Sequence, residues 1–205
     1  MTIDRRRLLA GSIAGAATLA LNSAPAWAQS FPTVEEVLFD PQIPALGNPK
    51  GDVTIAEFFD YQCPYCKKGH ADLKKVLEKD GNVRLVMKDW PIFGEVSFHA
   101  ANMVLAAQET DQYEKAMDAL MATPGRLQKK QIDELLAQAG IDLAALQKGY
   151  KKIRVRIDGI LNRNMDQANA FGFGGTPSFI VGTRIFHGVM DEKALTQAIA
   201  DARAG

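Results

Sequence analysis

The sequence is poor in cysteine. Only two of its 205 residues are Cys, and both stand in the run Cys63-Pro64-Tyr65-Cys66. A bridge between them closes a loop too short to join distant parts of the chain, so a disulfide framework like that of small secreted domains is excluded. A structural role is therefore a weak interpretation of this pair. No third Cys competes for either partner.

The sequence also lacks an excess of charge. Lys and Arg number 24, Asp and Glu also number 24, and the formal net charge at pH 7 is zero. Such a balance gives no electrostatic reason to bind nucleic acid or an anionic membrane surface. The most apolar stretch, residues 8–21, is short and rich in Gly and Ala. We therefore expect no nucleic-acid partner and no permanent membrane span in that stretch.

The first 28 residues have the features of a cleavable export signal. A charged start, Arg5-Arg6-Arg7, precedes the apolar stretch, and Ala26-Trp27-Ala28 is an A-x-A-type cleavage site. The run from Asp4 to Leu9 also resembles a twin-arginine signal, although Asp4 stands where Ser or Thr is usual. We expect a periplasmic protein cleaved near Ala28, with either export route open.

Beyond the signal, the residue pattern predicts an α/β fold with a long helical insertion. Residues 29–46 form an N-terminal lead-in, in which one amphipathic turn is followed by Pro and Gly breakers. Strand and helix patterns alternate over residues 47–94, helical spacing continues alone over residues 95–170, and strands return over residues 171–205. The expected strands are 53–59, 83–88, 177–181 and 184–186, the last two joined in a hairpin at Gly182-Thr183. The expected helices are 64–79, ended by Gly81-Asn82, five within 95–171 (among them 143–150 and 151–171), and 191–203.

The two cysteines follow directly on the first strand and open the next predicted helix. Unpaired backbone N–H groups and the helix dipole favour negative charge at a helix N-terminus, so the pKa of the Cys63 thiol is expected to be low. The thiolate is the nucleophile in disulfide exchange. Cys66, one turn along the same face, can attack a mixed disulfide at Cys63 and release the product. The motif therefore predicts thiol–disulfide exchange.

Two stretches together carry a family likeness. The run from Phe58 to Cys66, followed much later by Gly175-Thr176-Pro177-Ser178-Phe179, resembles the DsbA-type thiol:disulfide oxidoreductases. The likeness covers about Gly47 to the end of the chain. It implies a thioredoxin-like domain, formed by residues 47–94 and 171–205, with a central mixed β-sheet flanked by helices. An all-helical insertion domain would occupy residues 95–170.

The resemblance also implies roles for residues outside the cysteine pair. A cis peptide at Thr176–Pro177 would lie beside the cysteines, leaving the Thr176 backbone free to pair with an extended substrate. Glu57, on an otherwise apolar strand, is expected to be a buried acid whose raised pKa suits it to move protons for Cys66. Lys88 on the neighbouring strand is expected as its partner. Among the aromatic residues, Tyr61 and Tyr65 are expected at an apolar substrate rim, and Phe93, Phe98, Phe171 and Phe173 in core or interdomain packing.

The residues between the cysteines, Pro64 and Tyr65, bear on the direction of exchange. The strongest oxidants of the family carry Pro-His there, and Tyr65 offers only a neutral hydroxyl, so we expect a potential less oxidising than about −120 mV. The expected activity is the introduction of disulfides into unfolded or reduced exported proteins, with a membrane redox partner that resets the pair and no cofactor. The short lead-in is a poor dimerisation stalk, which favours a monomer.

Other functions stay open at this point. Pro-Tyr with Thr before the proline also resembles disulfide isomerases and exported proteins linked to copper tolerance, and Cys-Pro-Tyr-Cys is a glutaredoxin motif as well. In a different class, the two thiolates with His70 or His99 would carry Cu(I). Closed zinc sites need four ligands and the chain has only two cysteines, so we assign no metal site.

Overall fold

The computed structural model describes residues 31–205. The expected export signal and its cleavage near Ala28 lie outside the described residues. Within residues 31–205, no helix has both the length and the apolar character needed to cross a membrane.

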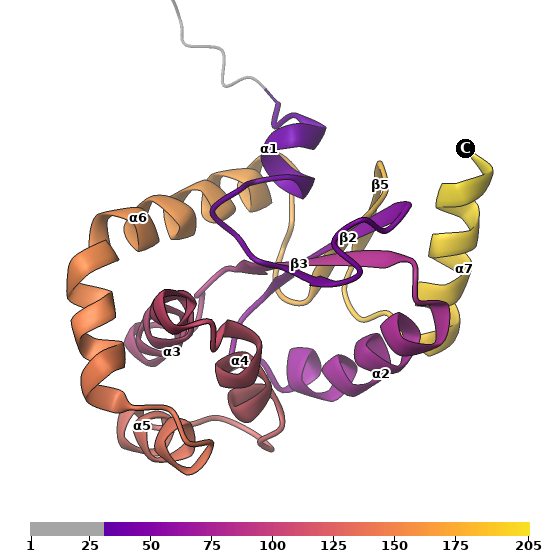
Figure 1. Ribbon diagram of the computed structural model, residues 1–205. Helices are drawn as coiled ribbons and strands as arrows, with labels where there is room; N and C mark the ends of the chain where they lie inside the picture. Colours follow the sequence, from indigo (N-terminus) through magenta and orange to yellow (C-terminus); the bar gives the residue numbers. More distant parts are fainter. Residues whose placement is uncertain (1–30) are drawn as a thin grey trace, which may run out of the picture. The chain divides into compact units, whose positions relative to one another are not determined.

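Five strands and seven α-helices make up the described chain (Figure 1). In chain order they are α1 (Val34–Leu38), β1 (Ala45–Gly47), β2 (Val53–Phe59), α2 (Pro64–Asp80), β3 (Val83–Asp89), α3 (Glu95–Ala106), a 3₁₀ turn (Ala107–Thr110), α4 (Tyr113–Met121), α5 (Lys129–Gln138), α6 (Leu143–Ala170), β4 (Ser178–Val181), β5 (Arg184–His187) and α7 (Glu192–Ala204). This is the expected α/β architecture, with a helical segment inserted between β3 and β4.

The strands form one mixed sheet in the order β1-β3-β2-β4-β5. Strands β2 and β3 run parallel, and the other neighbouring pairs are antiparallel. The expected hairpin is present: Val181 pairs with Arg184 across Gly182 and Thr183, and Gly182 takes the left-handed conformation (φ +58°) that such a turn requires. Strand β1 was not expected, because its three residues lie among Pro and Gly breakers and form a strand only by pairing with β3.

Each face of the sheet is covered by its own hydrophobic cluster. Ile55 and Phe59 of β2 point into the larger cluster, which includes the cysteines and side chains of α2, α3, α4 and α7. Ala56 and Phe58, the alternate residues of the same strand, point into a smaller cluster with Leu38 of α1 and other residues near the end of α6. Because every residue of β2 is buried, the strand is central and both of its faces are covered by protein.

Local signals define the ends of α2, the helix that carries the cysteines. Pro64 occupies its first turn, where a missing N–H is tolerated because that group has no partner within the helix. At the other end Gly81 is left-handed (φ +69°), and its N–H donates to the Leu77 carbonyl. The expected stop at Gly81 is thus confirmed, and the helix runs for 17 residues from Pro64 to Asp80.

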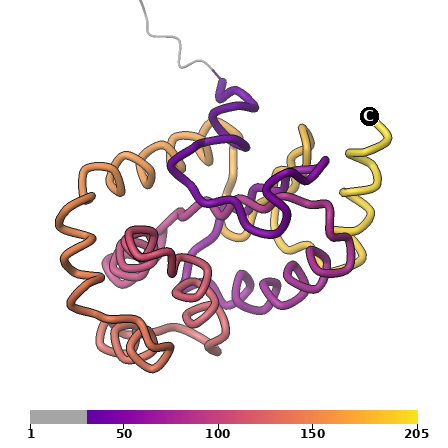
Figure 2. Tube along the Cα trace, in the orientation of Figure 1, coloured from indigo at the N-terminus to yellow at the C-terminus, as the bar shows by residue number. Residues whose placement is uncertain are grey.

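The helices α3 to α6 lie between β3 and β4 in the chain. Figure 2 shows the segment leaving the sheet after β3 and returning to it after a long arc formed by α6. We expected two helices, 143–150 and 151–171, where the structure has α6; the non-helical Ile153 (φ −113°, ψ 15°) marks a kink between its two parts. The expected division into two helices is therefore present, with the boundary at the Ile153 kink and not at residues 150–151.

Candidate active site

Cys63 is the N-cap of α2 and is positioned by the turn that follows β2. Its backbone N–H donates to the Asp60 carbonyl at 3.0 Å, and the N–H of Gln62 donates to Asp60 Oδ1 at 2.7 Å. The other carboxylate oxygen of Asp60 accepts from the N–H groups of Ile92 and Phe93, just after β3. Asp60 therefore ties the cysteine turn to the adjacent loop. Pattern analysis missed Asp60, although its place three residues before Cys63 was a signal.

The environment of Cys63 favours its thiolate. The N–H of Cys66 donates to Cys63 Sγ at 3.4 Å, whereas the protonated Cys63 thiol donates to the carbonyl oxygen of Thr176 at 3.3 Å. Hydrogen bonding from the Cys66 thiol, and then from Thr176 and the first-turn N–H groups, outweighs desolvation and lowers the pKa of Cys63 to about 6. At neutral pH the reduced protein therefore holds Cys63 largely as the thiolate.

Cys66 is held in the opposite state. It is completely buried, and burial raises its pKa, with further contributions from the hydrogen bond to Cys63 and from nearby Glu57. Both cysteines are free thiols in this structure. The two sulfurs thus differ as a nucleophile and a resolving thiol must differ, because one is ionised near neutral pH and the other keeps its proton.

The Thr176–Pro177 loop lies against the cysteine pair. The Thr176–Pro177 peptide bond is cis, as the resemblance implied, and the Thr176 carbonyl meets Cys63 Sγ. Residues 113 positions apart in the sequence therefore share one site.

Glu57 lies beneath this site on β2. Its side chain is 2% exposed. Burial, followed by the negative charge of Cys63, raises the pKa of Glu57 to about 8, so the group is a neutral carboxylic acid at pH 7. The expected buried acid is present where the sequence placed it. Its electrostatic neighbours are the two cysteines.

The expected pairing of Glu57 with Lys88 is wrong. In the parallel register of β2 and β3, Glu57 is opposite Met87 and Lys88 is opposite Phe58. Paired residues point to the same face of a sheet and successive residues to opposite faces. Lys88 therefore lies on the face away from the cysteines. It is fully buried, and desolvation lowers its pKa to about 8; the charges nearest to it are those of Asp40, Arg163 and Arg84.

The aromatic side chains divide differently from our expectation. Tyr65 is 63% exposed between the cysteines, where a rim residue belongs, but Tyr61 is buried and packs edge-on against Phe59. Phe93, expected in the core or between domains, is partly exposed, with the guanidinium of Arg126 5.0 Å from its ring centre. Tyr61 turns inward because it follows β2 directly and continues toward the larger cluster.

The histidines are held away from the sulfurs. His70 Nε2 is 2.9 Å from Asp118 Oδ1 on α4, and His99 Nε2 is 2.8 Å from Asp133 Oδ1 on α5. Among residues 31–205 no group of three or more His, Cys, Asp or Glu side chains is arranged to hold a metal ion. The contacts of His70 and His99 are thus ion-pair contacts with carboxylates and not contacts with the cysteines.

A helix-borne Cys-x-x-C pair facing a cis-proline loop, on a mixed sheet interrupted by helices, defines the thioredoxin-like class of dithiol proteins. Residues 40–201 match the family model described as thioredoxin, and the chain belongs to this family. The resemblance to DsbA-type proteins is likewise confirmed, since a thiol-disulfide exchange protein of that type, alpha-DsbA2, is among the similar solved structures.

Two solved structures illustrate the likeness. A thioredoxin-like oxidoreductase from Silicibacter pomeroyi is 36% identical, with a TM-score of 0.81 over 85% of this chain and 99% of that one. The thiol-disulfide exchange protein alpha-DsbA2 from Wolbachia pipientis is 27% identical, with a TM-score of 0.75 over 82% of this chain and 90% of that one. The enzyme class expected from the sequence is the class of these neighbours.

The curated relatives are much longer proteins. Na(+)/H(+) antiporter NhaA 1 of Salinispora arenicola is 26% identical over 164 residues, which are 78% of this chain and 24% of the relative. The corresponding antiporter NhaA 3 of Salinispora tropica likewise matches over 24% of its own length. The chain thus spans 24% of the length of these curated relatives.

Proposed function

We propose that this protein is an exported thiol–disulfide oxidoreductase that introduces disulfides into reduced protein substrates through Cys63 and Cys66. One observation carries the proposal: the Cys63 sulfur caps α2, receives the N–H of Cys66 at 3.4 Å and touches the Thr176 carbonyl at 3.3 Å. The Thr176–Pro177 loop and the nucleophilic sulfur therefore lie in contact, which supports a role for this loop in holding the substrate. The supporting likeness is to the thiol-disulfide exchange protein alpha-DsbA2.

In the oxidising direction the reaction starts from the Cys63–Cys66 disulfide. A substrate thiolate attacks Cys63 Sγ, the bond between Cys63 and Cys66 breaks, and Cys66 leaves with the electron pair and takes up a proton. A second substrate thiolate then attacks the substrate sulfur of the mixed disulfide, and Cys63 leaves as a thiolate. The substrate has lost two electrons and the protein has gained them. A low pKa makes Cys63 a good leaving group in this second step.

Glu57 is proposed as the proton donor to Cys66. With a pKa near 8 the carboxyl group carries a proton at pH 7, and it acts electrostatically on both sulfurs. When Cys66 leaves as a thiolate in a site without charge compensation, a neutral acid nearby is the group able to supply its proton. In the reverse direction the carboxylate would take that proton back. Lys88 is left out of this step, because it lies on the other face of the sheet.

The loop at Thr176 and Pro177 is proposed to hold the substrate. Pro177 has no N–H, and Thr176 lies just before β4, so its backbone is free to pair with an extended peptide whose cysteine lies over Cys63. The exposed Tyr65 ring would give apolar contact to an unfolded chain. The remaining expectations, a periplasmic location, a membrane redox partner and a monomeric state, belong to this proposal.

The direction of exchange can be tested with one substrate in two starting states. Purified protein is mixed with a reduced multi-disulfide protein and, separately, with the same protein carrying scrambled disulfides, and the native mass is measured in solution. We expect rapid oxidation, little unscrambling and the mass of a monomer. Efficient unscrambling would make the protein an isomerase. Tight Cu(I) binding by a protein with no exchange activity would refute the enzymatic proposal.

A further inference from the structure

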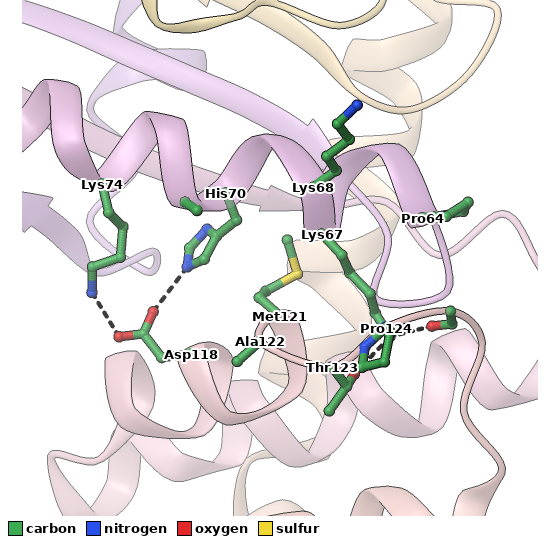
Figure 3. A pocket seen from close by; sticks show the side chains of 12 residues that line it. Pro64, Lys67, Lys68, His70, Lys74, Asp118, Met121, Ala122, Thr123 and Pro124 are labelled. Carbon is green, nitrogen blue, oxygen red and sulfur yellow. Dashed lines mark hydrogen bonds and ion pairs between the residues drawn. The ribbon is translucent and has the colours of Figure 1, made fainter.

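The lysine that follows the cysteine motif is buried and committed to a distant loop. Lys67 is 7% exposed. Its ammonium donates to Thr123 Oγ1 at 2.9 Å and to the Gly125 carbonyl at 2.6 Å, in the loop after α4 (Figure 3). These contacts lie at one end of a pocket of about 640 Å³ between α2 and α4. The neighbouring Lys68 lines the same pocket but is exposed.

The residue that precedes the motif holds the same loop at its other end. Gln62 is 3% exposed, and its side-chain carbonyl accepts a hydrogen bond from the N–H of Leu127 at 2.9 Å. Gln62 and Lys67 therefore flank the cysteines in the sequence, and they hold residues 123–127 by hydrogen bonds at both ends. Two independent side chains, more than 50 residues from their partners, join this loop to the first turn of α2.

The ammonium of Lys67 also belongs to the electrostatic environment of the site. Its charged neighbours are Asp60 and Cys63, both of which favour the protonated lysine, while desolvation by its surroundings lowers its pKa. The interaction is mutual, because a positive charge that Cys63 stabilises must itself stabilise the Cys63 thiolate. Across the pocket, His70 and Lys74 are occupied by Asp118 on α4, and Lys74 also by Glu114.

We propose that Lys67 is a positioning residue for Cys63, and that Lys67 and Gln62 together hold residues 123–127 of the helical insertion as one wall of the redox site. The ammonium does two things at once: it anchors the Thr123 and Gly125 end of the loop, and it adds positive charge beside the sulfur. The insertion thereby contributes to thiolate stability without touching the sulfur. This inference rests on the proposed function, because a stabilised thiolate matters only for exchange, but the tests below do not require exchange activity.

The first test titrates the reduced protein and follows thiolate absorbance in the ultraviolet. Lys67→Met keeps the length of the side chain and removes its charge, and Lys68→Met is the matched control on the exposed neighbour. We expect Lys67→Met to raise the pKa of Cys63 by about half a pH unit, the order for one partly screened charge. Lys68→Met should move it by much less. Lys67→Arg keeps the charge and should restore most of the shift.

The second test measures hydrogen exchange at the amide of Leu127 and its neighbours. Gln62→Leu removes the acceptor, and we expect exchange at Leu127 to become at least about tenfold faster, the size of one lost hydrogen bond. Lys67→Met should accelerate exchange at the other end of the loop. If Lys67→Met does not fold, Thr123→Val removes one acceptor of the ammonium from the opposite side and should loosen the loop in the same way.

The outcomes separate this inference from the proposed function. Equal titration shifts in Lys67→Met and Lys68→Met would overturn the positioning role of Lys67. Unchanged hydrogen exchange in Gln62→Leu would overturn the role of Gln62 in holding residues 123–127. Neither readout needs substrate turnover. A wild-type protein without exchange activity would refute the proposed function alone, and the titration and hydrogen-exchange results would still stand or fall by themselves.

Discussion

Glu57 and Lys88 are ionisable residues buried on adjacent central strands, one position apart in register, yet they face opposite sides of the sheet. Burial acts on both by favouring the neutral form: it raises the pKa of Glu57 and lowers the pKa of Lys88, each to about 8. On the same face they would form an ion pair that keeps both charged. On opposite faces each stands alone, and only Glu57 is coupled to the cysteines.

The difference shows that the environment of a buried ionisable residue in this fold depends on the face of the sheet to which its side chain points. The Glu57 face meets the cysteine helix, so its neutral carboxyl is part of the redox site. The Lys88 face meets Asp40, which is paired with Arg163 at 2.8 Å, and the lysine ammonium has no hydrogen-bond partner within residues 31–205. Under the proposed function, the Glu57 face takes part in the chemistry and the Lys88 face does not. Substitutions that remove the ionisable group at each of the two residues can test this distinction.

The largest expected effect is at Cys63 itself. Cys63→Ser should lower thiol–disulfide exchange by a factor on the order of a thousand or more, because serine is not ionised and forms no mixed disulfide. Cys66→Ser should instead accumulate mixed disulfides at Cys63, since the resolving thiol is missing. The rate of reduction of a disulfide-bonded reporter and the mass of trapped adducts measure both. Exchange that survives in Cys63→Ser would refute the assignment of the redox site.

The second effect is the pH dependence of stability on the Glu57 side. A carboxyl whose pKa rises on folding binds more protons in the native state, so it destabilises the protein progressively as pH increases from about 4.5 to about 8. Glu57→Gln removes this dependence. We expect the variant to match the wild type near pH 4.5 and to exceed its free energy of unfolding by up to about 4 kcal/mol at pH 8.

Denaturant unfolding of the oxidised proteins across this pH range measures the difference. Comparing oxidised forms removes the thiolate of Cys63, which is the second cause of the shift, and leaves burial as the main one. Lys68→Met, whose side chain is exposed, is the control for a substitution without a buried titration. A constant gap between wild type and Glu57→Gln at all pH values would mean that the carboxyl does not titrate in this range.

The third effect is the opposite pH profile on the Lys88 side. Because the pKa of Lys88 falls on folding, the native state binds fewer protons than the unfolded state between about pH 8 and 10.5, and the wild type gains stability as the pH rises through that window. Lys88→Met should be more stable by about 3 kcal/mol below pH 8, and the gap should close near pH 10.5.

Exchange activity distinguishes the two faces directly. Lys88→Met should leave the exchange rate unchanged, whereas Glu57→Gln should slow the step in which Cys66 leaves by about tenfold or more, as expected for loss of a general acid. Stopped-flow measurement of mixed-disulfide formation gives both rates. Equal slowing in both variants would mean that the faces are not functionally distinct.

The local features of this site could be predicted from the sequence. Cys63 and Cys66 follow a strand and open a helix, and both the strand and the helix are encoded by nearby residues. The turn at Gly182 and the helix end at Gly81 were equally accessible, because each depends on a glycine in the left-handed conformation. The Thr176–Pro177 loop came from family resemblance, since no local pattern connects it to a cysteine 113 residues away.

What could not be predicted depends on register and on long-range contacts. Lys88 faces away from Glu57 because β2 and β3 pair so that Glu57 lies opposite Met87 and Lys88 lies opposite Phe58. The pattern of a single strand does not show which residues of two strands pair. Strand β1 exists only through its pairing with β3. No sequence pattern singles out Lys67, whose partners Thr123 and Gly125 lie 56 and 58 residues further along the chain.

The smallest expected effect lies at Tyr65, the exposed residue between the two buried cysteines. Tyr65 is 63% exposed and gives the thiolate no charge, so Tyr65→His should add a donor or a positive charge where solvent screens it. We expect the reduction potential to become more oxidising by at most about 30 mV, which is tenfold in the equilibrium constant. Equilibration with glutathione measures it, and Tyr65→Phe is the control for loss of the hydroxyl alone. A shift of the same size in Tyr65→Phe would assign the effect to the tyrosine hydroxyl. A shift only in Tyr65→His would mean that Cys63 responds to charge at the exposed position beside it as well as to the buried Glu57.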